Sequence, residues 1–157
     1  MCGIVGFTGE HQAAPILLDG LSKLEYRGYD SAGIAVRDGN EEVTVIKAKG
    51  KLEVLKKMTN DGEAVSGCCG IGHTRWATHG EPSTLNAHPH SSDDNNVVAV
   101  HNGIIENYQE LREKLTKSGY TFNSQTDTEV AVKLIDYYFK KYGQGPVDSI
   151  ARAMIRI

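Results

Sequence analysis

The chain has 157 residues, a usual size for one globular domain, and its 39% hydrophobic and 24% charged residues are ordinary for a folded protein. A formal net charge of −3, with no run of Lys or Arg, argues against a nucleic-acid binder, which needs clustered cations. The apolar stretches are too short to span a bilayer, and the N-terminus lacks a secretory signal pattern. We therefore expect a cytoplasmic protein with one folded core and no nucleic-acid or membrane partner.

Apolar periodicity and turn signals predict alternating strands and helices in the first half of the chain. The segment Asp38-Gly39-Asn40 separates two β-rich stretches, which indicates an antiparallel hairpin. The predicted elements are a strand over 5–9, a helix opened near Pro15 with Leu17, Leu21 and Leu24 on one face, strands over 31–36 and 43–48, a short helix around 52–58 and a strand over 69–74.

The second half of the chain begins with a long loop and then becomes helical. Residues 80–96 are rich in Pro, His, Ser and Asn, and loops of this length are often functional. A strand is expected over 97–101. Three helical patterns follow: one with Tyr108, Leu111 and Leu115, one opened by the capping-box spacing Thr126-x-x-Glu129, and one with Val147, Ile150 and Met154 that meets no stop signal. The chain looks cut rather than finished, and its fold class is α+β with antiparallel strands.

Cys2 directly follows the initiator methionine and leads into the first strand. Removal of Met1 would give this cysteine a free α-amine, and an amine beside a thiol can act as a nucleophile with its own base. The alternative is a small hydrophobic residue at a frayed terminus. Cys68 and Cys69 form no CxxC pair, so we predict buried structural thiols and neither a disulfide nor a cysteine zinc site.

Three polar clusters, 26–31, 73–80 and 101–107, each lie at the end of a predicted strand. Strand ends that open into loops commonly hold site residues on a rigid scaffold. Asn102 and Gly103 could supply a side-chain amide and a backbone N–H, the two donors of an oxyanion hole. The same pair is also typical of an ordinary Asn-Gly turn.

Two charged residues suit an amino-acid substrate, because Arg75 could bind a carboxylate and Asp127 an ammonium group. The alternatives are a surface ion pair for Arg75 and a favourable helix-dipole position for Asp127. Trp76, the single tryptophan, is either a core residue or a pocket lid.

Five of the six histidines lie between His73 and His101, a pattern that a metal site or a set of buried, hydrogen-bonded rings would explain. No cysteine or carboxylate stands at a ligand spacing from them, so we predict neither a metal nor another cofactor.

Six segments, in order along the chain, resemble the class II glutamine amidotransferases, a family of N-terminal-nucleophile hydrolases, and within it the glucosamine-6-phosphate synthases. The amino-acid sequences at 24–33 and 73–83 favour that branch over the amidotransferases that make phosphoribosylamine, asparagine or glutamate. The segments are CGIVG at 2–6, LEYRGYDSAG at 24–33, HTRWATHGEPS at 73–83, NAHPH at 86–90, HNGIIENY at 101–108 and SQTDTEV at 124–130.

The resemblance implies a four-layer αββα sandwich with antiparallel sheets, here incomplete, and a glutamine-hydrolysing site. It implies Cys2 as nucleophile, with its α-amine as base, and Asn102 and Gly103 as oxyanion donors. It also implies glutamine binding by Arg75 and Asp127, with Trp76, Thr78 and His79 lining the pocket and Arg27 organising it from behind.

In the family, the released ammonia converts fructose 6-phosphate into glucosamine 6-phosphate on sugar isomerase domains. The whole chain, 1–157, would then be the N-terminal part of the amidotransferase domain, without those isomerase domains. Missing strands would leave sheet edges unpaired, so we expect self-association into a homo-oligomer or pairing with strands of a partner. Two alternatives stay open: the glutaminase part of another class II amidotransferase, and an inactive fragment that only binds glutamine.

Overall fold

The computed structural model describes residues 2–25, 30–39, 42–76 and 80–157, which divide into two units. The first unit comprises residues 1–89 and 99–102, and the second comprises 90–98 and 103–157. Each unit has its own cluster of buried hydrophobic side chains, whereas composition led us to expect one core.

The first unit contains a four-stranded antiparallel sheet. Its strands are β1 (Gly3–Thr8), β2 (Ser31–Arg37), β3 (Thr44–Lys49) and β4 (Cys69–Arg75), in the spatial order β1-β4-β2-β3. The predicted strands and the β2–β3 hairpin are confirmed. Since β4 lies between β1 and β2, residues from three distant segments meet at its C-terminal end.

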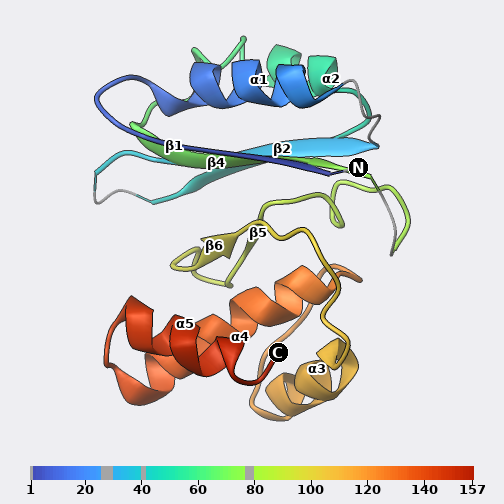
Figure 1. Ribbon diagram of the computed structural model, residues 1–157, viewed down its shortest axis with the longest axis vertical. Helices are drawn as coiled ribbons and strands as arrows, with labels where there is room; N and C mark the ends of the chain where they lie inside the picture. The colour runs from blue at the N-terminus through green and yellow to red at the C-terminus, as the bar shows by residue number, and fades with distance from the viewer. Residues whose placement is uncertain (1, 26–29, 40–41, 77–79) are drawn as a thin grey trace. The chain divides into compact units, whose positions relative to one another are not determined.

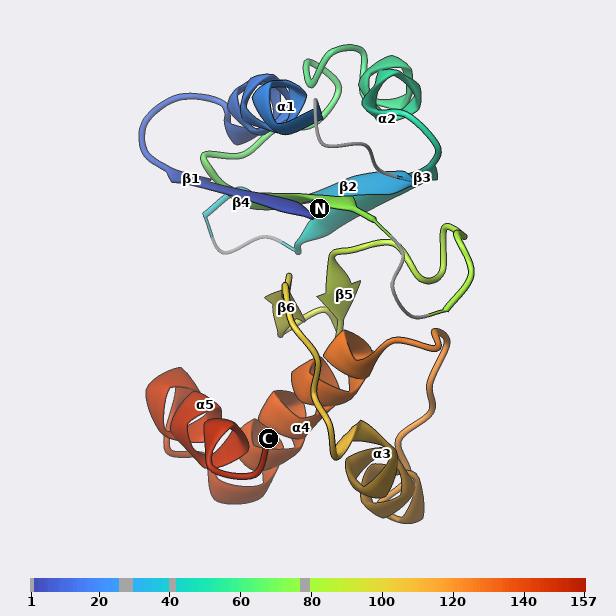
Figure 2. The ribbon, with the colours of Figure 1, turned by 45° about the vertical axis from the view of Figure 1, so that its right-hand side comes forward.

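Helices α1 (Ala13–Leu24) and α2 (Leu52–Met58) cover one face of this sheet (Figures 1 and 2). Of the predicted leucine stripe of α1, Leu17 and Leu21 are fully buried and Leu24 is half-buried. The core is completed by apolar side chains of β2 and α2, among them Ile34, Val36, Leu52 and Leu55.

Small residues on β4 let α1 approach the sheet closely. A Cβ added to Gly70 would lie 2.9 Å from Leu17 Cδ1, and one added to Gly72 would lie 3.0 Å from Leu21 Cδ1. Because side chains alternate between the faces of a strand, His73 and Arg75 belong to the opposite face. The face of β4 under α1 has room only for small residues. The large polar side chains of β4 therefore lie on the opposite face, which carries the candidate site.

The second unit contains a short β-ladder and three helices. The strands β5 (His90–Ser91) and β6 (Val98–Ala99) pair with each other. The helices are α3 (Tyr108–Lys117), α4 (Asp127–Tyr142) and α5 (Pro146–Met154), and all three were predicted. The strand expected over 97–101 is shorter than predicted, and most of the segment 80–96 is loop, as expected.

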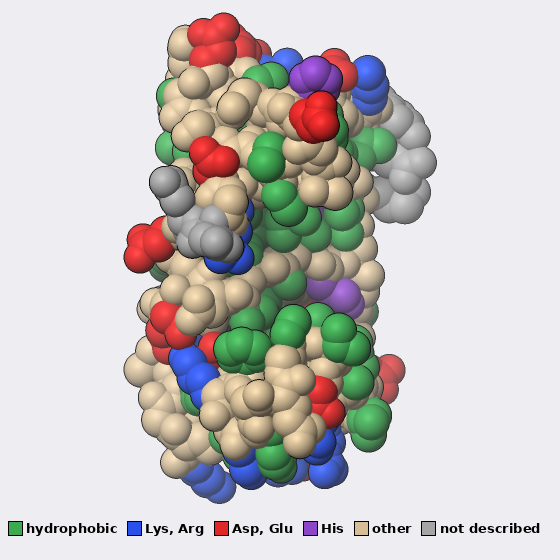
Figure 3. Space-filling view, turned by 90° about the vertical axis from the view of Figure 1, so that its left-hand side faces the viewer, with side chains coloured by type: hydrophobic (Ala, Val, Ile, Leu, Met, Phe, Trp, Pro, Cys, Tyr) green, Lys and Arg blue, Asp and Glu red, His purple; other side chains and the backbone are tan. Residues whose placement is uncertain are grey.

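The apolar stripe predicted on α5 is largely exposed, although the helix itself is confirmed. Val147, Ile150 and Met154 are 81%, 45% and 52% exposed, while the buried residues of α5 are Ser149 and Ala153. Figure 3 shows hydrophobic side chains at the molecular surface.

Within the described ranges, no helix combines the length and apolar content needed to cross a membrane.

We predict that Gly33→Ala destabilises the fold by about 1–3 kcal/mol, because overpacking displaces neighbouring backbone. A Cβ at Gly33 would lie 2.2 Å from the carbonyl oxygen of His88, which cannot move aside as a flexible side chain could. Urea unfolding measures the change in free energy. Gly6→Ala is the matched strand control, since no atom lies within 4 Å of its added Cβ. Equal stability of the two variants would contradict the prediction.

Candidate functional site

The thiol of Cys2 lies at the C-terminal end of β4. The β1–β4 register pairs Gly3 with Thr74, so the residue before β1 reaches the residues that follow Thr74. The Trp76 backbone N–H donates a hydrogen bond to Cys2 Sγ over 3.2 Å, and Sγ lies 3.6 Å from the Trp76 carbonyl oxygen. Cys2 is half-buried, and the Trp76 side chain is half-exposed rather than a core residue.

Asn102 joins Cys2 to a buried histidine. Its side-chain Nδ2 donates to the Cys2 carbonyl oxygen over 3.4 Å, and its Oδ1 lies 2.8 Å from His73 Nε2. Burial lowers the pKa of His73 to about 4. The hydrogen bond to Asn102 raises this pKa, but the charges of Arg75 and His101 lower it further. The imidazole is therefore neutral near pH 7.

The histidines that cluster in the sequence divide between the two units. His73 stacks on His88, with ring centroids 4.2 Å apart, and His88 Nδ1 accepts a hydrogen bond from the His101 backbone N–H. His90 belongs to the second unit, where it contacts Thr126. The interpretation as buried, hydrogen-bonded rings is confirmed for His73, His88 and His90. No group of three His, Cys, Asp or Glu that could hold a metal occurs in the described part of the chain.

Arg75 ends β4 and is 5% exposed, so it is not the surface ion pair considered as its alternative. Its guanidinium lies 3.8 Å from the carboxylate of Asp30 and donates to the Gly80 carbonyl oxygen over 3.2 Å. The Asp30 backbone N–H also donates to the Arg75 carbonyl oxygen. Asp30 thus fixes Arg75 through both backbone and side chain.

Three further predicted site residues, Arg27, Thr78 and His79, lie outside the described residues.

Gly103 and Asp127 belong to the second unit. Asp127 is the first residue of α4, and its Oδ2 accepts a hydrogen bond from the Ile105 backbone N–H over 2.8 Å. This contact ties the loop that follows Gly103 to the start of α4. Asn102 and Gly103 are both exposed.

The start of α4 is held by a buried polar cluster that we define as Ser124, Thr126, Glu129 and Lys133. Thr126 accepts the Glu129 backbone N–H, as the capping box predicts. The Glu129 carboxylate departs from the predicted box, because it accepts from the backbone N–H groups of Asn123 and Ser124 and from Ser124 Oγ. Lys133, fully buried, lies 3.4 Å from Glu129 and also contacts Asp93 and the Thr121 carbonyl oxygen.

Comparison with known proteins decides the family. The glutamine amidotransferase domain matches residues 53–151. The chain belongs to the glutamine amidotransferase domain family.

Similar relatives in this family are glutamine–fructose-6-phosphate aminotransferases (isomerizing). The protein of Clostridium tetani is 59% identical over 140 residues, which cover 89% of this chain and 23% of the relative. That of Clostridium acetobutylicum is 53% identical over 158 residues, covering 100% of this chain and 25% of the relative. The chain thus spans about a quarter of the length of these relatives.

Solved amidotransferase structures share the fold. The glutamine phosphoribosylpyrophosphate amidotransferase of B. subtilis superposes with a TM-score of 0.79 at 30% identity, over 99% of this chain and 33% of that one. The structure described as the allosteric regulatory enzyme of purine biosynthesis gives 0.78 at 32% identity. These likenesses confirm the predicted α+β fold class of N-terminal-nucleophile hydrolases with antiparallel sheets.

The sequence patterns gave no site role to His73 and Asp30, which contact the predicted site residues Asn102 and Arg75, nor to Glu129, which they placed only in a capping box. A usable signal existed for His73, because Gly70, Gly72 and Thr74 alternate with it on β4 and mark the face covered by α1. The capping box already pointed to Glu129. Asp30 lies in the quoted motif, but nothing in its spacing indicated a contact with Arg75.

Glu129→Gln is expected to destabilise the second unit at pH 7 by about 1–3 kcal/mol, since it removes buried charge-assisted hydrogen bonds. Burial would raise the pKa of Glu129, but the hydrogen bonds from Asn123 and Ser124 and the charge of Lys133 outweigh it and lower that pKa. A lowered folded-state pKa contributes stability above the unfolded value, about 4.3, and this contribution is lost as the pH falls through the folded value.

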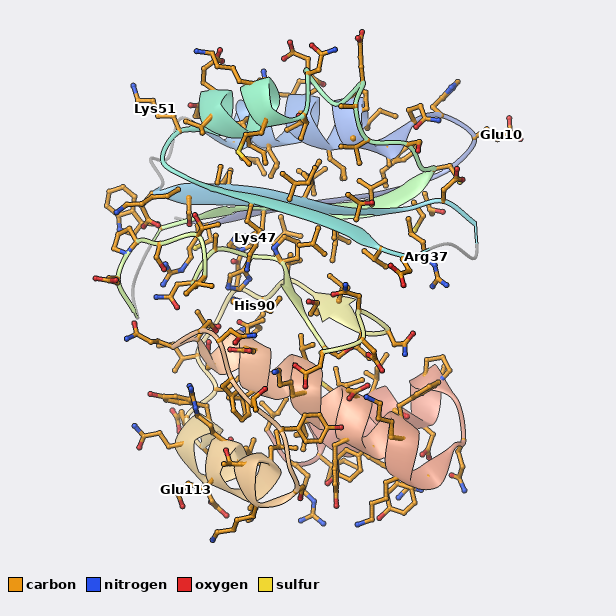
Figure 4. The ribbon with its side chains drawn as sticks, turned by 180° about the vertical axis from the view of Figure 1, so that it is seen from behind. Glu10, Arg37, Lys47, Lys51, His90 and Glu113 are labelled. Carbon is orange, nitrogen blue, oxygen red and sulfur yellow. The ribbon has the colours of Figure 1, made fainter. Side chains whose placement is uncertain are left out.

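The difference in unfolding free energy between wild type and Glu129→Gln should therefore stay constant from pH 7 to about 5 and shrink as the pH falls below about 4.3. Chemical denaturation across this range measures it. Glu113→Gln on α3 is the control, because Glu113 is exposed and labelled at the surface in Figure 4. A pH-independent difference would mean that the Glu129 charge does not stabilise α4.

Proposed function

We propose that this chain hydrolyses glutamine to glutamate and ammonia through a thioester on Cys2. The observation that carries the proposal is the convergence of Cys2 Sγ, the Trp76 backbone and the Asn102 side-chain amide at one end of β4, in a chain of the amidotransferase family. A thiol beside an orientable amide N–H is the pairing that acyl transfer requires.

In the first step, the Cys2 sulfur attacks the side-chain amide carbon of glutamine and forms a C–S bond. The oxygen of the tetrahedral intermediate receives hydrogen bonds from Asn102 Nδ2 and the Gly103 backbone N–H. The C–N bond then breaks, and the nitrogen leaves as ammonia after taking up the thiol proton, which the Cys2 α-amine, exposed by Met1 removal, accepts during the attack and now returns. Water hydrolyses the thioester, so glutamate leaves and the thiol is restored.

Substrate orientation in this proposal comes from two charges. Arg75 binds the glutamine carboxylate, because the five N–H donors of a guanidinium can serve Asp30, Gly80 and a ligand together. Asp127 binds the ammonium group. Gly103 and Asp127 take their roles from the motifs alone, as do the pocket-lining roles of Trp76, Thr78 and His79 and the organising role of Arg27.

The ammonia is proposed to serve the amination of fructose 6-phosphate in the complete protein. The support is identity: relatives named for that reaction are 53–59% identical to this chain, whereas the phosphoribosylpyrophosphate amidotransferase is 30% identical. In this proposal, residues 1–157 are the N-terminal part of the amidotransferase domain, and the isomerase chemistry lies in other domains. The cytoplasmic location and the homo-oligomer stay predictions.

Cys2→Ala is expected to abolish glutamate release from glutamine, with a loss on the order of 10³-fold or more, because the nucleophile acts as an indispensable unit. Enzymatic detection of glutamate measures the rate, and intact mass confirms Met1 removal in each sample. Cys69→Ala is the thiol control, because Cys69 on β4 is exposed, rather than buried as predicted, and the proposed mechanism does not use its thiol. Glutamate release by the Cys2→Ala variant would refute the mechanism. A wild-type chain that has lost Met1 but releases no glutamate would favour the alternative of a fragment that only binds glutamine.

Asp127→Asn should raise the KM for glutamine about 10- to 100-fold while changing kcat less, since one charge-assisted contact with bound substrate is lost. The asparagine keeps an oxygen that can accept the Ile105 N–H, so the start of α4 is expected to stay intact. Asp148→Asn on α5 is the control, because Asp148 forms an ion pair with Arg152 of the same helix. An unchanged KM in steady-state kinetics would remove Asp127 from the substrate site.

A further inference from the structure

His73 lies on the site face of β4 but takes no part in the proposed chemistry. It is 1% exposed and pairs across the sheet with Gly33 of β2. The missing side chain of Gly33 lets the His88 backbone approach, and the His88 ring stacks on His73 at an interplanar angle of 18°. The imidazole is held between the sheet and a second ring, so its orientation is fixed by packing.

The fixed ring faces one end of the Asn102 amide. Its Nε2 lies 2.8 Å from Asn102 Oδ1, while the other end of the amide, Nδ2, donates to the Cys2 carbonyl oxygen. The backbone that carries Asn102 is also anchored here, because the N–H of His101 donates to His88 Nδ1. We infer that His73 is a positioning residue: its Nε2–H holds Asn102 Oδ1 and thereby keeps the Nδ2 end of the amide directed toward Cys2.

The protonation of the ring decides the polarity of the amide. Burial keeps His73 neutral at pH 7, and a neutral imidazole has only one N–H. With that proton on Nε2, the amide oxygen faces the ring and the NH₂ group faces Cys2. With the proton on Nδ1, a lone pair would face the amide oxygen and favour the flipped amide. The flipped amide would present an acceptor toward Cys2, which repels an oxyanion.

The kinetic consequence rests on the proposed function. Removing one oxyanion donor commonly costs about 10²–10³ in kcat, so loss of the group that orients it should cost about 10- to 100-fold. KM should change little, because the ground-state carbonyl depends less on that donor than the oxyanion does. A residue that only supports the fold would instead lower stability without singling out kcat.

The kinetic test is a double-mutant cycle on the full chain, with glutamate release as readout. His73→Leu should lower kcat about 10- to 100-fold, whereas His73→Gln, whose amide N–H can reach Asn102 Oδ1, should restore it to within about threefold. In the Asn102→Ala background, His73→Leu should have almost no further effect, since the group it positions is absent. An equal loss in both backgrounds would overturn the inference.

A second measurement decides the inference without any activity. In ¹H–¹⁵N spectra of the wild-type chain, we expect the Nε2–H tautomer at His73 and an Asn102 side-chain amide signal that His73→Leu displaces and His73→Gln largely preserves. His11→Gln, at an exposed position, is the control. The Nδ1–H tautomer, or an amide signal insensitive to His73→Leu, would refute the positioning role. A wild type that releases no glutamate but shows these signals would contradict the proposed function alone.

Discussion

Antiparallel pairing of β1 with β4 is the interaction on which the rest of the first unit depends. The register that pairs Gly3 with Thr74 leaves the preceding cysteine at the exit of β4, where the Trp76 backbone meets its sulfur. A shift by one residue would turn every β1 side chain to the other face of the sheet. Close packing of α1 on Gly70 and Gly72 holds this register, because only one face of β4 is small enough to receive a helix.

Each unit buries a polar side chain whose contacts fix a neighbouring residue. The first unit buries an uncharged ring, His73, whose desolvation removes its proton and leaves a directional hydrogen bond. The second unit buries a cation, Lys133, and surrounds it with carboxylates of Glu129 and Asp93. A buried ion pair costs desolvation of both partners, so its benefit here is geometric: it fixes the start of α4 and with it the position of Asp127.

Local patterns predicted most of the elements, because periodicity and capping act within a few residues. The turn signal before β3 and the Thr126–Glu129 spacing correspond to contacts within one hairpin and one helix, and the leucines of α1 repeat with the period of that helix. Contacts between distant segments were not predictable in this way: His73 and Asn102 are 29 residues apart, and no propensity links them. The exposed apolar stripe of α5 also illustrates this limit. An amphipathic pattern predicts a helix, but it does not predict which other part of the protein packs against the apolar face.

The geometry described here bears on ammonia release and not on the molecule that receives the ammonia. In the proposed mechanism, a cysteine and an orienting amide would serve any acceptor, because ammonia leaves the site on Cys2 before the acceptor reacts with it. The shared fold with a phosphoribosylpyrophosphate amidotransferase fits this separation. Preference for fructose 6-phosphate therefore rests on sequence identity to relatives of which this chain spans about a quarter. It follows that substitutions around Cys2 and His73 should change the rate of ammonia formation while leaving the choice of acceptor to other parts of the protein.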